Sequence, residues 1–566
     1  MVSIEALYSQ PTYSGGGGIP FFAGSRRQFG GGIFGSLARL VLPTATRALK
    51  TIGKSVLKVG KNVAADVLRG RNITDALIDH SKQEALTQLE NHLDSSPPPP
   101  ARRRRRLLLG PDGLQLVTVS ASRQVLSKIS RQQRRHTSSV MAVNSGLLLL
   151  DDLPTSHAIQ ESGFTDYHPI STLDGGGPIE FVVTGTNEEY IDCNDVYLRV
   201  LLRVTLSDGT VIDATKHQVA CINSTLSSLF SDVTLILNDK QVEGGQQHYG
   251  YKSYILQLLQ YPSSVKRTHL AITGWIDDEA GKLDDATNTG FVKRASQLNG
   301  SPVIELFGPL NLDFFRQNRY LLSHTSMRIR LKRASEAFVL QDPSGANKYK
   351  IEIKDAILQV RRALINPNII NAHAKGLLKH NAQYPVNHTD LKSYTIAKGA
   401  STDIKENLFP TQVPKFIAIG FVTNKAYHGD YKCNPYNFQH FNLRKLILCH
   451  NGRPVMGRAL EPNFPEKHYA IAYSNSLIAL GQFNSSESNG WTYHMFGNGF
   501  TLMVFDLTAD NQVYAAHRHA IASGNVRLEL SFGSALPETI NVLIFSVSDN
   551  ALEVTAERNV EFNYTI

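Results

Sequence analysis

Two stretches of the sequence come close to patterns that bind phosphate. "ALKTIGKS" (Ala48 to Ser55) fits a loose phosphate-loop pattern, and "GQQHYGYKS" (Gly245 to Ser253) has Tyr251 where such a loop needs a lysine. A phosphate loop must follow a strand, so that backbone N–H groups at the start of a helix can cradle the phosphates. The first stretch lies inside a continuous helical pattern, and the second lacks the lysine. We therefore predict no nucleotide site at either place.

Two acidic stretches could supply oxygen ligands to a metal ion. They are "LDDLP" (Leu150 to Pro154) and "WIDDEAGKLDDA" (Trp275 to Ala286). A metal needs several converging oxygens, and acidic surface loops are more common, so we interpret both stretches as solvated loops. The sequence has no HExxH, no GxSxG and no paired Cys/His ligand set. We predict no catalytic residues, no metal ligands and no cofactor, which favours a structural protein over an enzyme.

The cysteines and the apolar runs indicate the compartment. Cys193, Cys221, Cys433 and Cys449 form no CxxC pair, and four cysteines in 566 residues are sparse. We interpret them as free thiols in a reducing compartment. The sequence has no run of 18 apolar residues, so we predict no membrane-spanning helix. A charged stretch followed by an apolar one, as in a secretory signal, does not follow Met1. We therefore expect a protein that is not secreted.

Positive charge is concentrated at the N-terminal end. Residues 1–140 hold 21 Lys and Arg against 8 Asp and Glu, whereas residues 141–566 carry a net charge of −4. Residues 1–32 are rich in glycine and predicted to be disordered, residues 33–93 are predicted to be helical, and residues 94–140 form a Pro/Arg-rich basic linker. Composition changes again at Met141, which could be the natural start of a second protein.

The helical segment carries one apolar stripe. Its apolar residues recur every three or four positions, with lysines and arginines between them. The stripe includes Phe34, Leu37, Val41, Ile52, Val56, Val59 and Val63. A helix with an apolar stripe and a cationic face is suited to lying in a membrane interface, so residues 33–68 are a candidate membrane-active helix. Packing on its own protein and contact with DNA phosphates remain alternatives.

An arginine run in the linker is the better candidate for contact with nucleic acid. It consists of Arg102, Arg103, Arg104, Arg105 and Arg106. Arginines neutralise phosphates, and a short basic run can equally be a nuclear-import signal or a solvated tail.

Beyond residue 160 the apolar period changes to two. "VYLRVLLRVTL" places Val196, Leu198 and Val200 on one face, and "MRIRLKR" points Met327, Ile329 and Leu331 inward. Turn signals such as "SDG" (Ser207 to Gly209) and "HNGRP" (His450 to Pro454) separate such runs. This pattern predicts an all-β chain of many short strands, arranged as a sandwich.

The β region is also duplicated. "DVTLILNDKQVEG" (Asp232 to Gly244) is similar to "LRKLILCHNGRPVMG" (Leu443 to Gly457), and each follows an apolar strand and precedes an alternating one. Two copies predict two similar sandwiches in tandem. We expect them at residues 141–345 and 396–566, joined by a bridging segment at 346–395.

Four segments in order resemble the double jelly-roll major capsid proteins of the Polinton/Maverick and adintovirus group. They are "DYHPISTLDGGGPIEFVVTGTNEEYIDCNDVYLRVLLRV" (Asp166 to Val204), "LLSHTSMRIRLKRAS" (Leu321 to Ser335), "KCNPYNFQHFNLRKLILCHNGRPV" (Lys432 to Val455) and "RLELSFGSALPETINVLIFSVSDNALEV" (Arg527 to Val554). The resemblance implies an all-β fold of two tandem eight-stranded jelly rolls. It also implies that three chains form a pseudo-hexagonal capsomer of an icosahedral shell.

The N-terminal part resembles the membrane-lytic minor capsid protein of adenoviruses and its Polinton counterparts. In that family a protease site precedes an amphipathic helix. "QFGGG" (Gln28 to Gly32) is similar to the site, and a match places the cut between Gly31 and Gly32. Glycines suit a narrow protease cleft because they have no side chain to clash. Major and minor capsid proteins are normally separate chains, so their union here departs from the family.

The two resemblances imply a set of partners and a location. The partners are two further copies of the chain, neighbouring capsomers, penton or minor capsid proteins, a double-stranded DNA genome, a host membrane and a maturation protease. The implied location is the virion, with the host nucleus or cytoplasm during assembly. The alternative is a host-domesticated β-sandwich binding protein whose arm attaches to membrane or nucleic acid. A carbohydrate-active jelly-roll enzyme is disfavoured, because we find no convergent carboxylate pair.

Overall fold

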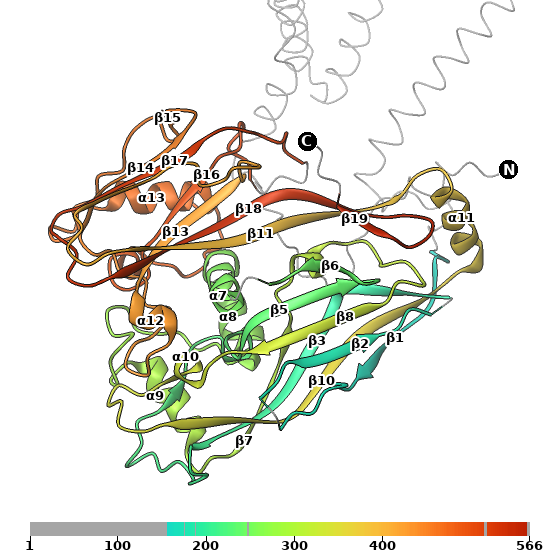
Figure 1. Cartoon of the computed structure of the whole chain (residues 1–566), viewed down its shortest axis with the longest axis horizontal. Coiled ribbons are helices and arrows are strands. Elements are labelled where there is room, and N and C mark those ends of the chain that lie inside the picture. Colours follow the sequence, from blue (N-terminus) through green and yellow to red (C-terminus); the bar gives the residue numbers. More distant parts are fainter. Residues whose placement is uncertain (1–155, 175, 187, 246–247, 514–517, 563–566) are drawn as a thin grey trace, which may run out of the picture. The chain divides into compact units, whose positions relative to one another are not determined.

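The computed structural model describes residues 156–562 except 175, 187, 246–247 and 514–517 (Figure 1). The predictions for residues 1–140, which include the Gly31–Gly32 site, the amphipathic helix and the arginine run, lie outside the described residues. So does the acidic stretch Leu150 to Pro154. No helix among residues 156–562, with those gaps, is long and apolar enough to cross a membrane.

The first jelly roll consists of two four-stranded antiparallel sheets. One sheet has the order β1 (Ile159–Tyr167), β10 (Tyr349–Ile365), β3 (Glu189–Leu206) and β7 (Val303–Pro309). The other has the order β2 (Ile179–Val183), β8 (Met327–Arg333), β5 (Phe230–Leu237) and β6 (Lys240–Glu243). Two short strands, β4 (Ala220–Cys221) and β9 (Leu340–Gln341), pair with each other outside these sheets.

The second jelly roll repeats this arrangement. One sheet has the order β11 (Ala382–Ile396), β18 (Ile540–Val554), β13 (Phe416–Thr423) and β16 (Leu502–Asp506), and β19 (Val560–Phe562) also pairs with β18. The other sheet has the order β12 (Thr402–Lys405), β17 (Val526–Phe532), β14 (Leu443–His450) and β15 (Arg453–Pro454). Counted along each copy without β4, β9 and β19, the strands follow the orders 1-8-3-6 and 2-7-4-5 in both. The chain is therefore a double jelly roll, and the predicted fold class is confirmed.

The structure differs from the expected bridge at residues 346–395. Most of this segment belongs to the two jelly rolls themselves, because β10 pairs with β1 and β3 of the first, and β11 pairs with β18 of the second. Only a short connection with α11 (Pro367–Leu377) lies between β10 and β11. The side chain of Asn366 accepts a hydrogen bond from the N–H of Asn368 and caps this helix, and Pro367 occupies its first turn.

Alternating side chains build the two cores. The side chains predicted to point inward from β8, those of Met327, Ile329 and Leu331, are fully buried, whereas Arg328 and Arg330 are exposed. Strand β13 differs, because its continuous apolar run is buried on both faces. A continuous run is typical of a strand covered on both sides.

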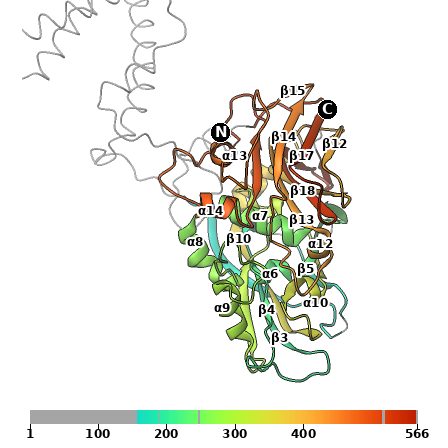
Figure 2. The ribbon, with the colours of Figure 1, turned by 90° about the vertical axis from the view of Figure 1, so that its left-hand side faces the viewer.

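Helices fill the longest connections of both jelly rolls. Between β6 and β7 lie α7 (Tyr249–Gln260), α8 (Ser263–Arg267), the 3-10 helix η2 (His269–Thr273) and α9 (Thr289–Leu298), and between β15 and β16 lie α13 (Ala470–Ala479) and α14 (Tyr493–Phe496). Shorter helices are α6 (Thr225–Ser228), η3 (Asp313–Arg316), α10 (Glu336–Val339) and α12 (Asn424–His428). Figure 2 shows α8, α9, α13 and α14 on the same side, away from β12 and β14.

The two cores exchange elements. Helix α7 belongs to the first jelly roll by sequence, but its Tyr254 and Ile255 pack in the hydrophobic core of the second. In return Leu552 and Val560, from the end of the second jelly roll, pack in the core of the first. Figure 1 shows α7 between the strands of the two jelly rolls. Each core is therefore completed by residues from the other half of the chain.

Candidate functional site

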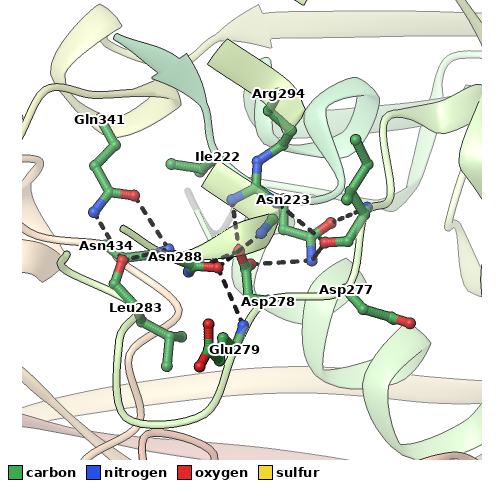
Figure 3. A network of polar contacts seen from close by, with 12 residues as sticks. Ile222, Asn223, Asp277, Asp278, Glu279, Leu283, Asn288, Arg294, Gln341 and Asn434 are labelled. Atoms are coloured by element: carbon green, nitrogen blue, oxygen red, sulfur yellow. Dashed lines mark hydrogen bonds and ion pairs between the residues drawn. The ribbon is translucent and has the colours of Figure 1, made fainter. Parts of the chain in front are cut away.

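The acidic stretch Trp275 to Ala286 is part of the contact between the two jelly rolls, which we call the junction. The carboxylate of Asp278 is 1% exposed and accepts a hydrogen bond from the guanidinium of Arg294 in α9 at 2.7 Å (Figure 3). It also accepts hydrogen bonds from the side-chain amides of Asn288 and Asn223, at 3.0 and 3.2 Å. The interpretation of this stretch as a solvated loop is wrong for Asp278, because its charge is paired and buried.

Arg294 is satisfied by more than this one carboxylate. Its Nε donates to the carbonyl oxygen of Cys221 at 2.8 Å, and its Nη1 donates to that of Ile276 at 3.0 Å. The arginine side chain is 2% exposed. A buried guanidinium is tolerated only when such acceptors replace water, so this ion pair depends on the local backbone as well as on Asp278.

Two asparagines fix the loop around the ion pair. Asn288 caps α9, because its Oδ1 accepts from the N–H of Gly290 at 2.9 Å, and the same oxygen accepts from the N–H of Glu279 at 3.1 Å. The Oδ1 of Asn223 accepts from the N–H of Ile276 at 3.0 Å. Amide side chains satisfy backbone groups that a buried loop would otherwise leave unpaired.

The other end of the acidic stretch binds the second jelly roll. The carboxylate of Asp284 accepts hydrogen bonds from the backbone N–H of Asn434 and from the side-chain amide of Asn437, both at 2.6 Å. Gln341 donates to the carbonyl of Leu283 at 2.8 Å, and Figure 3 shows it beside Asn434. Burial raises the pKa of Asp284. The stretch that could have held a metal therefore connects the two jelly rolls.

Aromatic rings extend the junction. Tyr254 of α7 stacks on Tyr436 of the second jelly roll, with ring centroids 3.9 Å apart and an angle of 3° between the planes. The hydroxyl of Tyr436 forms a 2.6 Å hydrogen bond with that of Ser228 in α6. Tyr251 packs edge-on against Tyr436 as well. Stacked and edge-on pairs add to the stability gained by burying the rings.

A buried lysine binds backbone carbonyl groups at the C-terminal end of α7. Lys266 in α8 donates from Nζ to the carbonyl of Leu258 at 2.6 Å and to that of Asn489, in the second jelly roll, at 2.7 Å. Its ammonium lies 5.5 Å from the centre of the Trp275 ring. Burial lowers the pKa of Lys266 to about 7. The side chain thus joins the C-terminal end of α7 to the second jelly roll.

The other residues considered as functional candidates in the sequence are mostly buried in the fold. Tyr251 and Ser253, in the second phosphate-like stretch, are buried in α7. All four cysteines are free, and Cys193, Cys221 and Cys449 are buried. Among the described residues 156–562, no group of three or more His, Cys, Asp or Glu side chains could hold a metal ion.

Comparisons with known proteins place the fold in a class. No family model matches the sequence. The chain is similar to solved structures of double jelly-roll capsid proteins. A chain in the structure of the Sputnik virophage covers 74% of this chain and 91% of its own length, with a TM-score of 0.51 at 14% identity. The match to the mavirus major capsid protein covers 75% of this chain and 93% of that protein, with a TM-score of 0.46 at 10% identity.

A particular relative is found among curated animal proteins. The uncharacterized protein F54H12.2 of Caenorhabditis elegans is 24% identical over 396 residues, which span 68% of this chain and 92% of the relative.

Proposed function

We propose that the protein is a structural capsid protein of a virus, or of a virus-derived transposable element of the Polinton–adintovirus type. Three copies form a pseudo-hexameric capsomer, and capsomers build an icosahedral shell. The observation that carries this proposal is the repeated strand order, 1-8-3-6 and 2-7-4-5, in two jelly rolls of one chain. Two equivalent jelly rolls per chain allow three chains to present six similar edges.

The junction supports this role because a shell subunit must keep a fixed shape. An angular error between the two jelly rolls would be repeated at every capsomer contact. The Asp284 contacts, the hydrogen bond from Lys266 to Asn489 and the exchanged core elements all resist such rotation. The function of the site is therefore mechanical, and it needs no turnover chemistry.

Exposed apolar side chains on the helical side supply a surface for a second copy. Ile471 and Ile478 lie on one face of α13, two turns apart, and are 57% and 54% exposed. Ile272 in η2 and Val292 in α9 are also about half exposed. Exposed apolar side chains that cluster mark protein contacts, and obligate interfaces commonly bury more than about 2,000 Å².

The N-terminal arm has a separate part in this proposal. A maturation protease cuts between Gly31 and Gly32, the helix at residues 33–68 disturbs a host membrane after release, and Arg102–Arg106 contact the DNA genome or direct nuclear import. Leakage of anionic liposomes with a peptide of residues 33–68 tests the helix, and an inert peptide rejects the lytic role. Mass spectrometry after incubation with the cognate protease tests the cut, and an intact Gly31–Gly32 bond rejects it.

Electron microscopy and mass measurement of the recombinant protein test the capsid role. We expect trimers or shell-like particles from the full chain and from residues 141–566, and stable monomers alone would reject the proposal. Ile478→Asp should weaken the trimer, because it places a charge on the exposed face of α13. Leu378→Asp is the matched control, since Leu378 follows α11 and is 80% exposed.

A second candidate is a host-domesticated β-sandwich binding protein. The Caenorhabditis elegans relative favours it, because a similar chain belongs to an animal proteome. In that case the exposed face of α13 would bind a host protein, and the purified chain would stay monomeric at concentrations where a capsid protein trimerises.

A further inference from the structure

Three ionisable side chains meet in the first jelly roll, outside the contacts described above. Lys252 of α7 lies between Glu243, the last residue of β6, and Asp313, the first residue of η3. Its Nζ is 2.5 Å from Oε1 of Glu243 and 3.0 Å from Oδ2 of Asp313. The amine therefore touches two carboxylates at once.

The cluster is buried and held rigidly. The side chains of Lys252, Glu243 and Asp313 are 11%, 10% and 3% exposed. Oδ2 of Asp313 also accepts from the backbone N–H of Thr389 in β11 at 2.6 Å, and Oε2 of Glu243 accepts from the N–H of Asp313 at 2.7 Å. These contacts fix both carboxyl groups around the amine.

The charges of the cluster do not balance, which favours protonation of one carboxyl group. One ammonium faces two carboxylates. Burial, and next the nearby charge of Asp313, raise the pKa of Glu243 to about 7. Burial lowers the pKa of Lys252, but the charges of Asp313 and Glu243 outweigh this and raise it. At neutral pH Lys252 is thus an ammonium facing the carboxylate of Asp313, and the raised pKa of Glu243 favours its protonated form.

We propose that Lys252 and Asp313 join through an isopeptide bond, with Glu243 as the group that carries the protons. The ammonium of Lys252 first passes one proton to the carboxylate of Asp313, which leaves the net charge unchanged. Nζ then attacks Cγ of Asp313, so that a C–N bond forms and a C–O bond breaks. Glu243, in its acid form, donates a proton to the departing oxygen and regains one from the nitrogen. The products are an amide and one water, with no other reactant.

The surroundings favour this condensation. A site that excludes water disfavours separated charges, which brings the neutral amine and carboxylic acid closer in free energy to the ion pair. Low water content also opposes hydrolysis of the amide. A cavity of about 20 Å³ is lined by Glu243, Asp313, Val386 and Leu552. A volume above about 10–15 Å³ holds one water molecule, so the leaving water has a place next to the bond.

A second buried lysine pair provides an internal comparison. Nζ of Lys415 is 2.5 Å from Asp549, and their side chains are 12% and 9% exposed. Among the described residues it contacts this one carboxylate and the side-chain oxygen of Asn387, at 2.9 Å. Asn387 is exposed to water, and Asp549 also contacts His519, which favours its ionised form, so Lys415 should stay a free amine.

Peptide mapping of the purified full chain tests the proposal. We expect the intact mass to be lower than the sequence mass by one water. Trypsin should fail to cut after Lys252, and tandem mass spectrometry should find the peptides of Lys252 and Asp313 joined. A succinimide at an aspartate also removes water, but it would leave these peptides separate. Recovery of the unlinked Lys252 peptide from folded protein after prolonged incubation overturns the proposal, as does a link at Lys415 instead.

Variants separate the roles of the three residues. Asp313→Asn should still form the link but lose ammonia in place of water, which no purely structural role predicts. Glu243→Gln should fold, as judged by circular dichroism, and remain unlinked, because glutamine cannot shuttle the protons. Lys252→Arg should show no mass loss. If Glu243→Gln links at the wild-type rate, the assignment of Glu243 is overturned.

Discussion

Replacing Asp278 with alanine should destabilise the protein strongly, because it leaves Arg294 buried without its counter-ion. The arginine side chain is 2% exposed and lies 2.7 Å from the carboxylate that would be lost. Its two backbone acceptors, the carbonyls of Cys221 and Ile276, would remain but carry no charge. The amides of Asn288 and Asn223 would each lose an acceptor too.

The size of the effect follows from the burial of the pair. Removing one partner of a buried ion pair costs about 3–5 kcal/mol, since the other charge stays away from water. Replacing both partners with apolar residues of similar volume is often neutral. We therefore expect Asp278→Ala to lower the free energy of unfolding by about 3–5 kcal/mol. The double variant Asp278→Leu, Arg294→Met should recover most of this loss.

Chemical denaturation of the full chain measures both effects, with the midpoint and slope taken from tryptophan fluorescence and circular dichroism. Glu305→Ala is the matched control, because Glu305 is 59% exposed in its ion pair with Arg199 and should change the midpoint little. A loss of less than about 1 kcal/mol for Asp278→Ala, the range of surface ion pairs, would show that the buried pair does not stabilise the fold in this way. A double variant less stable than Asp278→Ala would equally contradict it.

Three further outcomes can be measured. Burial lowers the pKa of Lys266 from 10.5 to about 7. The unfolded state therefore binds one more proton between these values, and the free energy of unfolding should fall as the pH drops from about 10.5 to 7. Lys266→Met should remove this pH dependence of the free energy of unfolding, measured from denaturation curves. In the same assay, Gly244→Ala should lower the free energy of unfolding by more than about 1 kcal/mol beyond the effect of Gly209→Ala. Both glycines have positive φ, but only at position 244 would the new Cβ lie 2.6 Å from Cα of Thr234. Residues 378–566 expressed alone should show no cooperative thermal transition, because their core lacks α7, and a sharp transition would contradict this.

The strands could be predicted from the sequence because their signal is local. Met327, Ile329 and Leu331 alternate with exposed cations, and burial of alternate side chains needs no knowledge of the partner strand. The internal similarity of Asp232–Gly244 and Leu443–Gly457 indicated the duplication for the same reason, since β5–β6 and β14–β15 are equivalent hairpins of the two copies. The bridge predicted at residues 346–395 was wrong, because the pairing of β10 with β1 and β3, and of β11 with β18, depends on strands that are distant in the sequence.

The junction could not be predicted, because its signals are distant in sequence. Asp278 and Arg294 are 16 residues apart, and Asp284 and Asn434 are separated by 150. Each charged residue alone resembles a solvated one, and only the fold shows that it is buried. The available signal was that the apolar residues of α7 cover more than half of its circumference, and a wide apolar surface must be covered on more than one side.

Because the two cores exchange elements, neither core can be completed until the last strands of the chain have been synthesised. Helix α7 ends at Gln260, but β18 and β19, which complete the two cores, end at Val554 and Phe562. At typical translation rates of 5–20 residues per second, α7 waits about 15–60 s for its covering strands. During that time the side chains of Tyr254 and Ile255 lack the second core that covers them in the finished fold. A chain that ends before β18 and β19 lacks residues of both cores, so a truncated product should leave the apolar side chains of α7 exposed.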